Sequence, residues 1–147
     1  MDSHAISIFI WIFAAMIAAS FWEAYSEGRN SWSKGKHGWR FKVLGYEFTA
    51  YHFFLFYVMF PLLLTLPFVI FGWNLRDFGI VASAYILGLS LEDIFWYVVN
   101  PEVKFRELYS SFSDYYPWIR INGKKIIPVG YLESIIFSIL IWYFIWR

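Results

Sequence analysis

Residues 79–100 read GIVASAYILGLSLEDIFWYVVN, and this stretch decides the fold. It contains no Lys or Arg, and its only charged residues are the adjacent acids Glu92 and Asp93. A helix of about 20 predominantly apolar residues is long enough to cross the hydrocarbon core of a bilayer. We therefore expect residues 79–100 to form a transmembrane helix that carries two acidic side chains.

The composition of the whole chain is also typical of a membrane protein. Hydrophobic residues make up 60% of its 147 residues and charged residues only 16%, whereas soluble domains carry about 25% charged residues. Nine Trp are present, a residue that bilayer proteins place at the interface between lipid and water. The formal net charge of +1 gives no general attraction for nucleic acid, and the absence of Cys excludes disulfides and thiolate metal sites.

Three further apolar segments lack Lys and Arg and are about as long as a membrane span: 5–22, 48–71 and 129–146. The chain is therefore predicted to be all-α, a single membrane domain over residues 1–147 that folds as a four-helix bundle. Pro61 and Pro67 are expected to kink the second span. The first span is expected to be retained rather than cleaved as a signal peptide, because Asp2 and His4 precede it instead of basic residues.

The distribution of the basic residues predicts the orientation. The two long loops, 23–47 and 101–128, each contain five of the twelve Lys and Arg residues, while Arg76 and Arg147 are the other two. Short loops rich in Lys and Arg stay in the cytoplasm. We expect both long loops to be cytoplasmic and both termini to be external, in a multi-pass protein of the cell membrane.

The long loops contain patterns of their own. Asn100-Pro101 ends the third span and is expected to start a short amphipathic helix, whose apolar face includes Phe105, Leu108, Tyr109 and Phe112. Asn122-Gly123 separates two short apolar-rich runs and predicts a β-hairpin over residues 118–127. The alternation of apolar and basic residues over 39–43 suggests a third strand that would extend this hairpin.

The acids in the spans are the candidates for chemistry. Glu92 and Asp93 lie about eight residues, roughly 10–12 Å, from the cytoplasmic end of the third span. An acid at that depth costs several kcal/mol unless it is paired, protonated or next to a wet cavity. The other spans place polar residues in the same half of the membrane, and the outer half is almost wholly apolar. The prediction is an inward-facing pocket that holds a divalent metal ion, with these candidate ligands: Glu23, Glu27, His52, Glu92, Asp93 and Glu133.

Three functions are compatible with such a pocket. The first is a metal-dependent enzyme that acts on a lipid or another membrane-soluble substrate, with Glu92 or Asp93 as ligand or base and with Arg120, Lys124 and Lys125 contacting lipid headgroups or phosphate. The second is an oligomeric channel or transporter for cations or protons. The third is an accessory subunit of a larger membrane complex, whose polar residues contact a partner. A purely structural role is the alternative for Glu23 and Glu27, which would then pair with Arg29 or Arg40.

Overall fold

The computed structural model describes residues 2–29 and 38–147. Its α-helices and π-helical segments, in chain order, are α1 (Ser3–Glu27), α2 (Ala50–His52), η1 (Phe53–Met59), α3 (Phe60–Phe71), α4 (Leu75–Val99), α5 (Val129–Ile141) and η4 (Trp142–Trp146). Its strands are β1 (Arg40–Val43), β2 (Tyr46–Thr49), β3 (Trp118–Ile121) and β4 (Lys124–Pro128). Two short 3₁₀ helices, η2 (Phe105–Tyr109) and η3 (Ser111–Ser113), lie between α4 and β3.

Four helices are long and apolar enough to cross a membrane: Ser3–Glu27, Ala50–Phe71, Leu75–Val99 and Val129–Trp146. The second of these, hereafter the second helix, comprises α2, η1 and α3 in continuous succession. It begins two residues later than predicted, because Phe48 and Thr49 belong to β2 and the Thr49 hydroxyl caps the helix. The first helix continues five residues beyond the predicted end, so Glu23 and Glu27 are helical residues.

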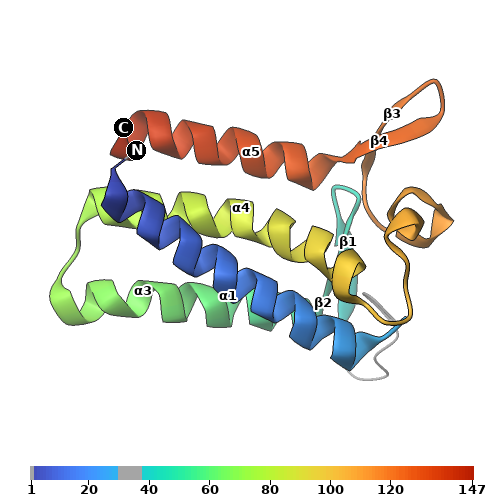
Figure 1. Ribbon diagram of the computed structural model, residues 1–147, viewed down its shortest axis with the longest axis horizontal. Coiled ribbons are helices and arrows are strands. Elements are labelled where there is room, and N and C mark those ends of the chain that lie inside the picture. The colour runs from blue at the N-terminus through green and yellow to red at the C-terminus, as the bar shows by residue number, and fades with distance from the viewer. Residues whose placement is uncertain (1, 30–37) are drawn as a thin grey trace.

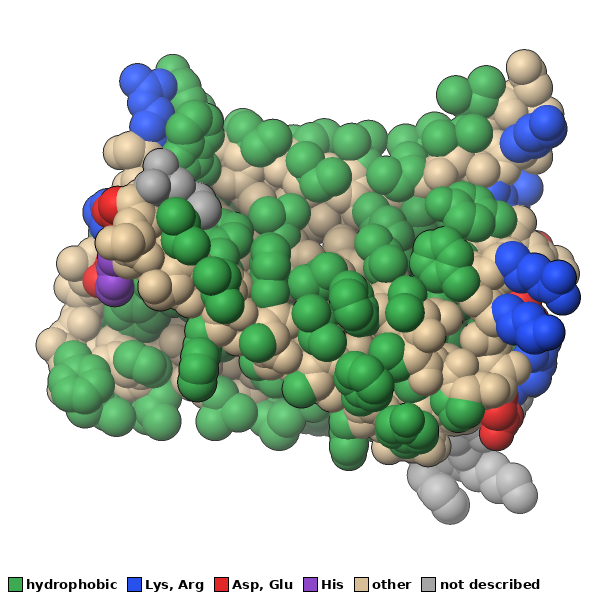
Figure 2. Space-filling view, viewed as in Figure 1, with side chains coloured by type: hydrophobic (Ala, Val, Ile, Leu, Met, Phe, Trp, Pro, Cys, Tyr) green, Lys and Arg blue, Asp and Glu red, His purple; other side chains and the backbone are tan. Residues whose placement is uncertain are grey.

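The two ends of the bundle differ (Figure 1). Both termini and the connection between α3 and α4 lie at one end, which we call the terminal end, and the strands lie at the other, which we call the hairpin end. On the face drawn in Figure 2, the Lys, Arg, Asp and Glu side chains gather at these two ends and a band of hydrophobic side chains lies between them. An apolar band of this kind matches the hydrocarbon layer of a bilayer.

The central helix is α4, which packs against both α1 and α5. Gly88 makes a close approach to α1 possible, since a Cβ atom at this position would lie 2.8 Å from Met16 Cγ. On the other side, Ser90 shares a hydrogen bond with Ser134, and the Ser138 hydroxyl donates to the Ser83 carbonyl. Small residues and hydroxyl groups of this kind hold membrane helices together. The contact between Ser138 and Ser83 lies in the half of the bundle toward the terminal end of these helices, where the sequence predicted almost only apolar residues.

The second helix contains a π-helical stretch directly before Pro61. In η1 the hydrogen bonds span five residues, and the Phe60 N–H donates to the Leu55 carbonyl. The next carbonyl, that of Phe56, would need the N–H of Pro61, which proline lacks. The Tyr85 hydroxyl of α4 donates to the Phe56 carbonyl instead. The irregularity expected at Pro61 is thus a local π-helix that a neighbouring side chain satisfies.

The β-hairpin predicted around Asn122-Gly123 is confirmed. Strands β3 and β4 are antiparallel, with an irregularity between Ile119 and Arg120, and both turn residues have positive φ angles, 50° and 79°. The expected three-stranded arrangement is wrong. Strand β1 pairs instead with β2, the next segment of the chain, in a separate two-stranded sheet. Its turn residues Leu44 and Gly45 also have positive φ angles, and a short turn costs less loop entropy than a distant pairing.

The amphipathic helix predicted after Asn100-Pro101 is also wrong. The Asn100 side chain does accept hydrogen bonds from the N–H groups of Glu102 and Val103, as a helix cap would. A bend and the short helices η2 and η3 follow instead of an α-helix. Serine hydroxyls compete for the backbone here, because Ser110 donates to the Glu107 carbonyl and Ser113 donates to the Leu108 carbonyl.

Candidate metal centre

Helix α1 presents two acids toward the interior of the bundle at the hairpin end. Glu23 and Glu27 are four residues apart, a spacing that places side chains on the same helix face. Glu23 is buried and Glu27 is half-buried. The Tyr51 hydroxyl, on the second helix, donates a hydrogen bond to the Glu23 carboxyl group.

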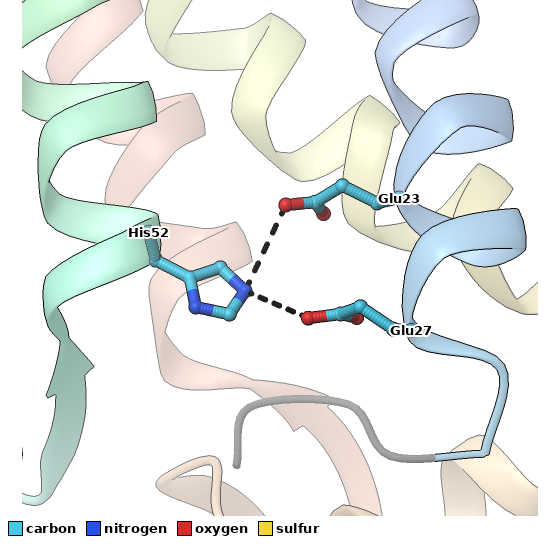
Figure 3. Close-up of side chains that lie close together, drawn as sticks. All are labelled: Glu23, Glu27 and His52. Atoms are coloured by element: carbon cyan, nitrogen blue, oxygen red, sulfur yellow. Dashed lines mark ion pairs between the residues drawn. The ribbon is translucent and has the colours of Figure 1, made fainter. Parts of the chain in front are cut away.

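The second helix holds an imidazole opposite these acids. His52 is buried, and its Nδ1 atom lies 2.6 Å from the Oγ1 atom of Thr49, the residue that caps the helix. Its Nε2 atom faces α1, 3.7 Å from Glu23 Oε1 and 3.5 Å from Glu27 Oε1 (Figure 3). A partner on one ring nitrogen that leaves the other directed at carboxylates is the arrangement that orients metal-ligating histidines.

The three side chains form a group with the dimensions of a metal site. One ligand atom from each of Glu23, Glu27 and His52 lies within 4.8 Å of the others. Around an ion bound at about 2.0–2.2 Å, neighbouring ligand atoms lie roughly 3–3.6 Å apart. The distances of 3.5 and 3.7 Å between Nε2 and the two carboxylates therefore need only a small adjustment to share one ion. Carboxylate and imidazole ligands together suit Zn²⁺, Mn²⁺ and Fe²⁺.

Glu92 of α4 adjoins this group. It is buried, and its carboxyl group lies next to that of Glu23. One oxygen of Glu23 and one of Glu92 are buried and accept no hydrogen bond from the described part of the chain. Glu92 is seven residues from the end of α4, about 10 Å along the helix. It thus stands beside the three candidate ligands, on the side that leads deeper into the bundle.

Asp93 lies in a different environment, although it lines the same cavity. Its Oδ1 accepts a hydrogen bond from the Tyr116 hydroxyl, and its Oδ2 accepts one from Tyr131 at 3.0 Å. The two adjacent acids therefore have separate partners, as expected for neighbours about 100° apart on a helix. Tyr116 precedes β3 and Tyr131 belongs to α5, so Asp93 joins the 101–128 loop to α4 and α5.

Glu133 belongs to α5 and lines the same cavity. It accepts a hydrogen bond of 2.7 Å from the Tyr46 hydroxyl and is exposed. The pKa of Tyr46 is raised, mainly by burial and further by this contact with Glu133. Among the described residues, the compact group of possible ligand atoms contains Glu23, Glu27 and His52 and leaves out Glu133.

A cavity of about 450 Å³ connects these groups and is lined by residues of all four long apolar helices. Ligand sites in proteins are commonly about 300–1,000 Å³. Much of its wall is aromatic or aliphatic, including Phe56, Leu89 and Phe137. Tyr57 on the second helix and Phe137 on α5 are both 55% exposed, so the cavity opens sideways between these helices, within the apolar band.

The basic residues that were predicted to contact phosphate or lipid headgroups lie on the hairpin of β3 and β4. Arg120 pairs with Asp114 at 3.1 Å, and Lys125 pairs with the same carboxylate at 2.9 Å. Lys125 is largely enclosed, with 7% of its side chain exposed, and its ammonium group lies over the Trp118 ring. These cations lower the pKa of Asp114, and the hydrogen bond from Lys125 is the main cause. Lys124 remains exposed.

Aromatic residues organise the site, and their hydrogen bonds to the acids were not predicted from the sequence. Tyr46, Tyr51, Tyr116 and Tyr131 each hydrogen-bond one of the candidate acids, and Trp96 lines the cavity one turn beyond Glu92. The one available signal was the Gly-Tyr pair that precedes an acid at both Gly45-Tyr46 and Gly130-Tyr131. No protein-family model matches the chain, and no curated protein or solved structure is significantly similar to it.

Proposed function

We propose that this chain is a metal-dependent membrane enzyme that acts on a lipid or another membrane-soluble substrate. Glu23, Glu27 and His52 hold one divalent cation, and the cavity beside them holds the substrate. In such a site the cation polarises an oxygen of the substrate or makes a bound water more acidic. Glu92, the acid next to the ligands, exchanges a proton with the substrate or water.

The main support for this proposal is that two carboxylates and one imidazole lie within 4.8 Å of one another at the wall of a cavity. Three protein ligands with a fourth position left for water or substrate are the arrangement of catalytic zinc sites. The sideways opening between Tyr57 and Phe137 supports a substrate that arrives from the lipid layer rather than from water.

The proposal includes an orientation in the cell membrane. The hairpin end, with eight of the ten Lys and Arg residues that the structure describes, faces the cytoplasm, and the terminal end, with Arg76 and Arg147, faces outward. Arg120 and Lys124 then lie where anionic headgroups of the inner leaflet can reach them. The metal centre lies within about one helical turn of the cytoplasmic ends of α1 and the second helix.

Metal analysis of the purified protein tests this function. The protein is stripped with a chelator, reloaded with Zn²⁺ or Mn²⁺, and freed of excess metal before elemental analysis. We expect about one ion per chain in the wild type and a large loss of bound metal in Glu27→Gln and His52→Gln. Glu133→Gln is the matched control, since it neutralises a carboxylate of the same cavity outside the proposed ligand set.

Two outcomes would contradict the proposal. A wild-type protein that retains no stoichiometric metal would favour an accessory subunit or a proton pathway through the Glu23 and Glu92 pair. Equal loss of metal in Glu133→Gln and Glu27→Gln would mean that the ion is bound diffusely by the acidic cavity. Circular dichroism of each variant establishes that loss of metal does not reflect loss of the helices.

A further inference from the structure

The charge of the cavity restricts what kind of lipid it can accept. The described residues that line it include no Lys or Arg, while they include five carboxyl groups: Glu23, Glu27, Glu92, Asp93 and Glu133. One divalent cation balances two negative charges, so the loaded site still has no surplus positive charge. A phosphate or carboxylate head would therefore be repelled inside this cavity, where the low dielectric strengthens the repulsion.

Buried polar groups without a hydrogen-bond partner further restrict which lipid headgroup fits the cavity. The Oε1 atoms of Glu23 and Glu92 and the Nε1–H group of Trp96 are buried and make no hydrogen bond with any described residue. Buried polar groups in native proteins are rarely left in this condition. Glu92 and Trp96 are four residues apart on α4, so they lie on the same helix face, and both line the cavity. Together they offer a hydrogen-bond acceptor and a donor one helical turn apart.

The apolar wall indicates where the rest of the ligand lies. Leu89 and Phe137 line the cavity on α4 and α5, and Phe56 lines it on the second helix. Phe137 is also exposed at the sideways opening. A hydrocarbon tail that extends from these polar groups along this wall reaches the hydrocarbon layer without crossing water.

From these features we infer that the substrate is a long-chain lipid with a neutral hydroxyl head, an inference that rests on the proposed function of the cavity. The hydroxyl group donates a hydrogen bond to the Glu92 carboxyl group and accepts one from the Trp96 indole N–H. It lies next to the ion held by Glu23, Glu27 and His52. The tail follows Leu89 and Phe137 to the opening between α5 and the second helix.

Competition binding of lipids with one tail and different heads tests this inference. The protein, in bilayer discs of neutral phosphatidylcholine, is labelled with a photoreactive hexadecanol and challenged with unlabelled hexadecanol, palmitate, hexadecyl phosphate, hexadecylamine and hexadecyl methyl ether. We expect hexadecanol to compete best, and palmitate and the phosphate to compete at least about tenfold more weakly. The ether lacks the donated hydrogen and should be weaker by about 3- to 10-fold, the value of one hydrogen bond.

A variant separates the indole N–H from the ring. Trp96→Phe keeps an aromatic side chain but removes the donor. It should weaken both hexadecanol and the methyl ether about 3- to 10-fold, because both oxygens accept this hydrogen bond, and it should leave the bound metal unchanged. Trp11→Phe is the matched control, because Trp11 is 80% exposed on the outside of α1. The comparison of heads uses the wild type, so it remains decisive even if Trp96→Phe does not fold.

Each outcome has a defined meaning. Equal competition by palmitate and hexadecanol, or strongest competition by hexadecylamine, would overturn the inference. So would unchanged hexadecanol binding in Trp96→Phe. Selectivity for the alcohol in a protein that binds no metal would support the inference about the head and refute the proposed metal chemistry. Stoichiometric metal without selectivity for the alcohol would support the proposed metal site and refute the inference about the headgroup.

Discussion

The network around Asp93 predicts how firmly the 101–128 loop is held against the bundle. Its carboxylate accepts hydrogen bonds from Tyr116 in the loop and Tyr131 in α5. A hydrogen bond to a charged group contributes about 1.5–3 kcal/mol in soluble proteins, and hydrogen bonds between membrane helices average about 0.6 kcal/mol with a maximum near 1.7. We therefore expect Tyr116→Phe to lower the free energy of unfolding by about 1–2 kcal/mol.

Asp93→Asn adds a second measurement. Asparagine keeps one acceptor oxygen but replaces the other by an amide, so one of the two tyrosine hydroxyls loses its acceptor. The expected cost is about 1–3 kcal/mol. Because Asp93 and Tyr116 are in direct contact, their effects should not add, and the double variant should reveal a coupling energy of about 1 kcal/mol.

Unfolding by dodecyl sulfate in mixed micelles, followed by far-ultraviolet circular dichroism, measures these free energies. Tyr25→Phe is the matched control, because Tyr25 is 69% exposed on α1, and we expect it to change stability by less than about 0.5 kcal/mol. A coupling energy below about 0.3 kcal/mol between Asp93 and Tyr116 would refute the network. Loss of bound metal in Asp93→Asn would show that Asp93 is a ligand rather than an anchor.

Three further predictions concern other parts of the chain. Because the chain has no Cys, a membrane-impermeant maleimide on intact cells should label Arg76→Cys and leave Lys124→Cys unlabelled; the opposite pattern would invert the proposed orientation. The Arg29 guanidinium donates to Glu107 and lowers the pKa of that carboxyl below its normal 4.5, so this ion pair stabilises the fold fully above pH 4.5 and its contribution is lost as the pH falls through the lowered pKa. The thermal stability of Glu107→Gln should therefore fall less steeply in acid than that of the wild type, and identical pH profiles would exclude this ion pair as a cause of the loss of stability in acid. Gly79→Ala should cost about 1–2 kcal/mol, since the added Cβ would lie 2.7 Å from Cγ2 of the stiff, β-branched Ile145; Gly88→Ala should cost less, because the neighbouring Met16 side chain is flexible, and the reverse order in the micelle assay would contradict this packing.

The helices could be predicted from the sequence because their signal is local. The length of an apolar run without Lys or Arg is enough to define a span, and residues 129–146 match the fourth helix at both ends. The turn at Asn122-Gly123 could be predicted for the same reason, because two adjacent residues tolerate positive φ.

The errors in the loops have physical causes. The 39–43 segment has the alternation of a strand, but that pattern does not specify its partner, and the adjacent β2 was closer along the chain than the distant hairpin. After Asn100, the apolar residues have helical spacing, yet the hydroxyls of Ser110 and Ser113 bind backbone carbonyls and the chain forms 3₁₀ turns instead.

The candidate site could be predicted in part. The depth of the acids along each span identified Glu23, Glu27, His52 and Glu92 as candidates, because depth follows from residue number. Rotation about the helix axis and tilt between helices determine which side chains touch, and a single sequence does not contain them. The pairing of Asp93 with Tyr116 and of Glu133 with Tyr46 therefore became visible only in three dimensions.

The central claim is that His52 and the two acids of α1 bind one metal ion, and electron spin-echo measurements on the Mn²⁺-loaded protein test it most directly. A directly bonded imidazole nitrogen modulates the Mn²⁺ echo, whereas carboxylate ligands do not. We predict a single nitrogen coupling in the wild type and in Glu133→Gln, and its loss in His52→Gln. A wild-type spectrum without nitrogen coupling, or a coupling that persists in His52→Gln, would contradict the proposed metal centre.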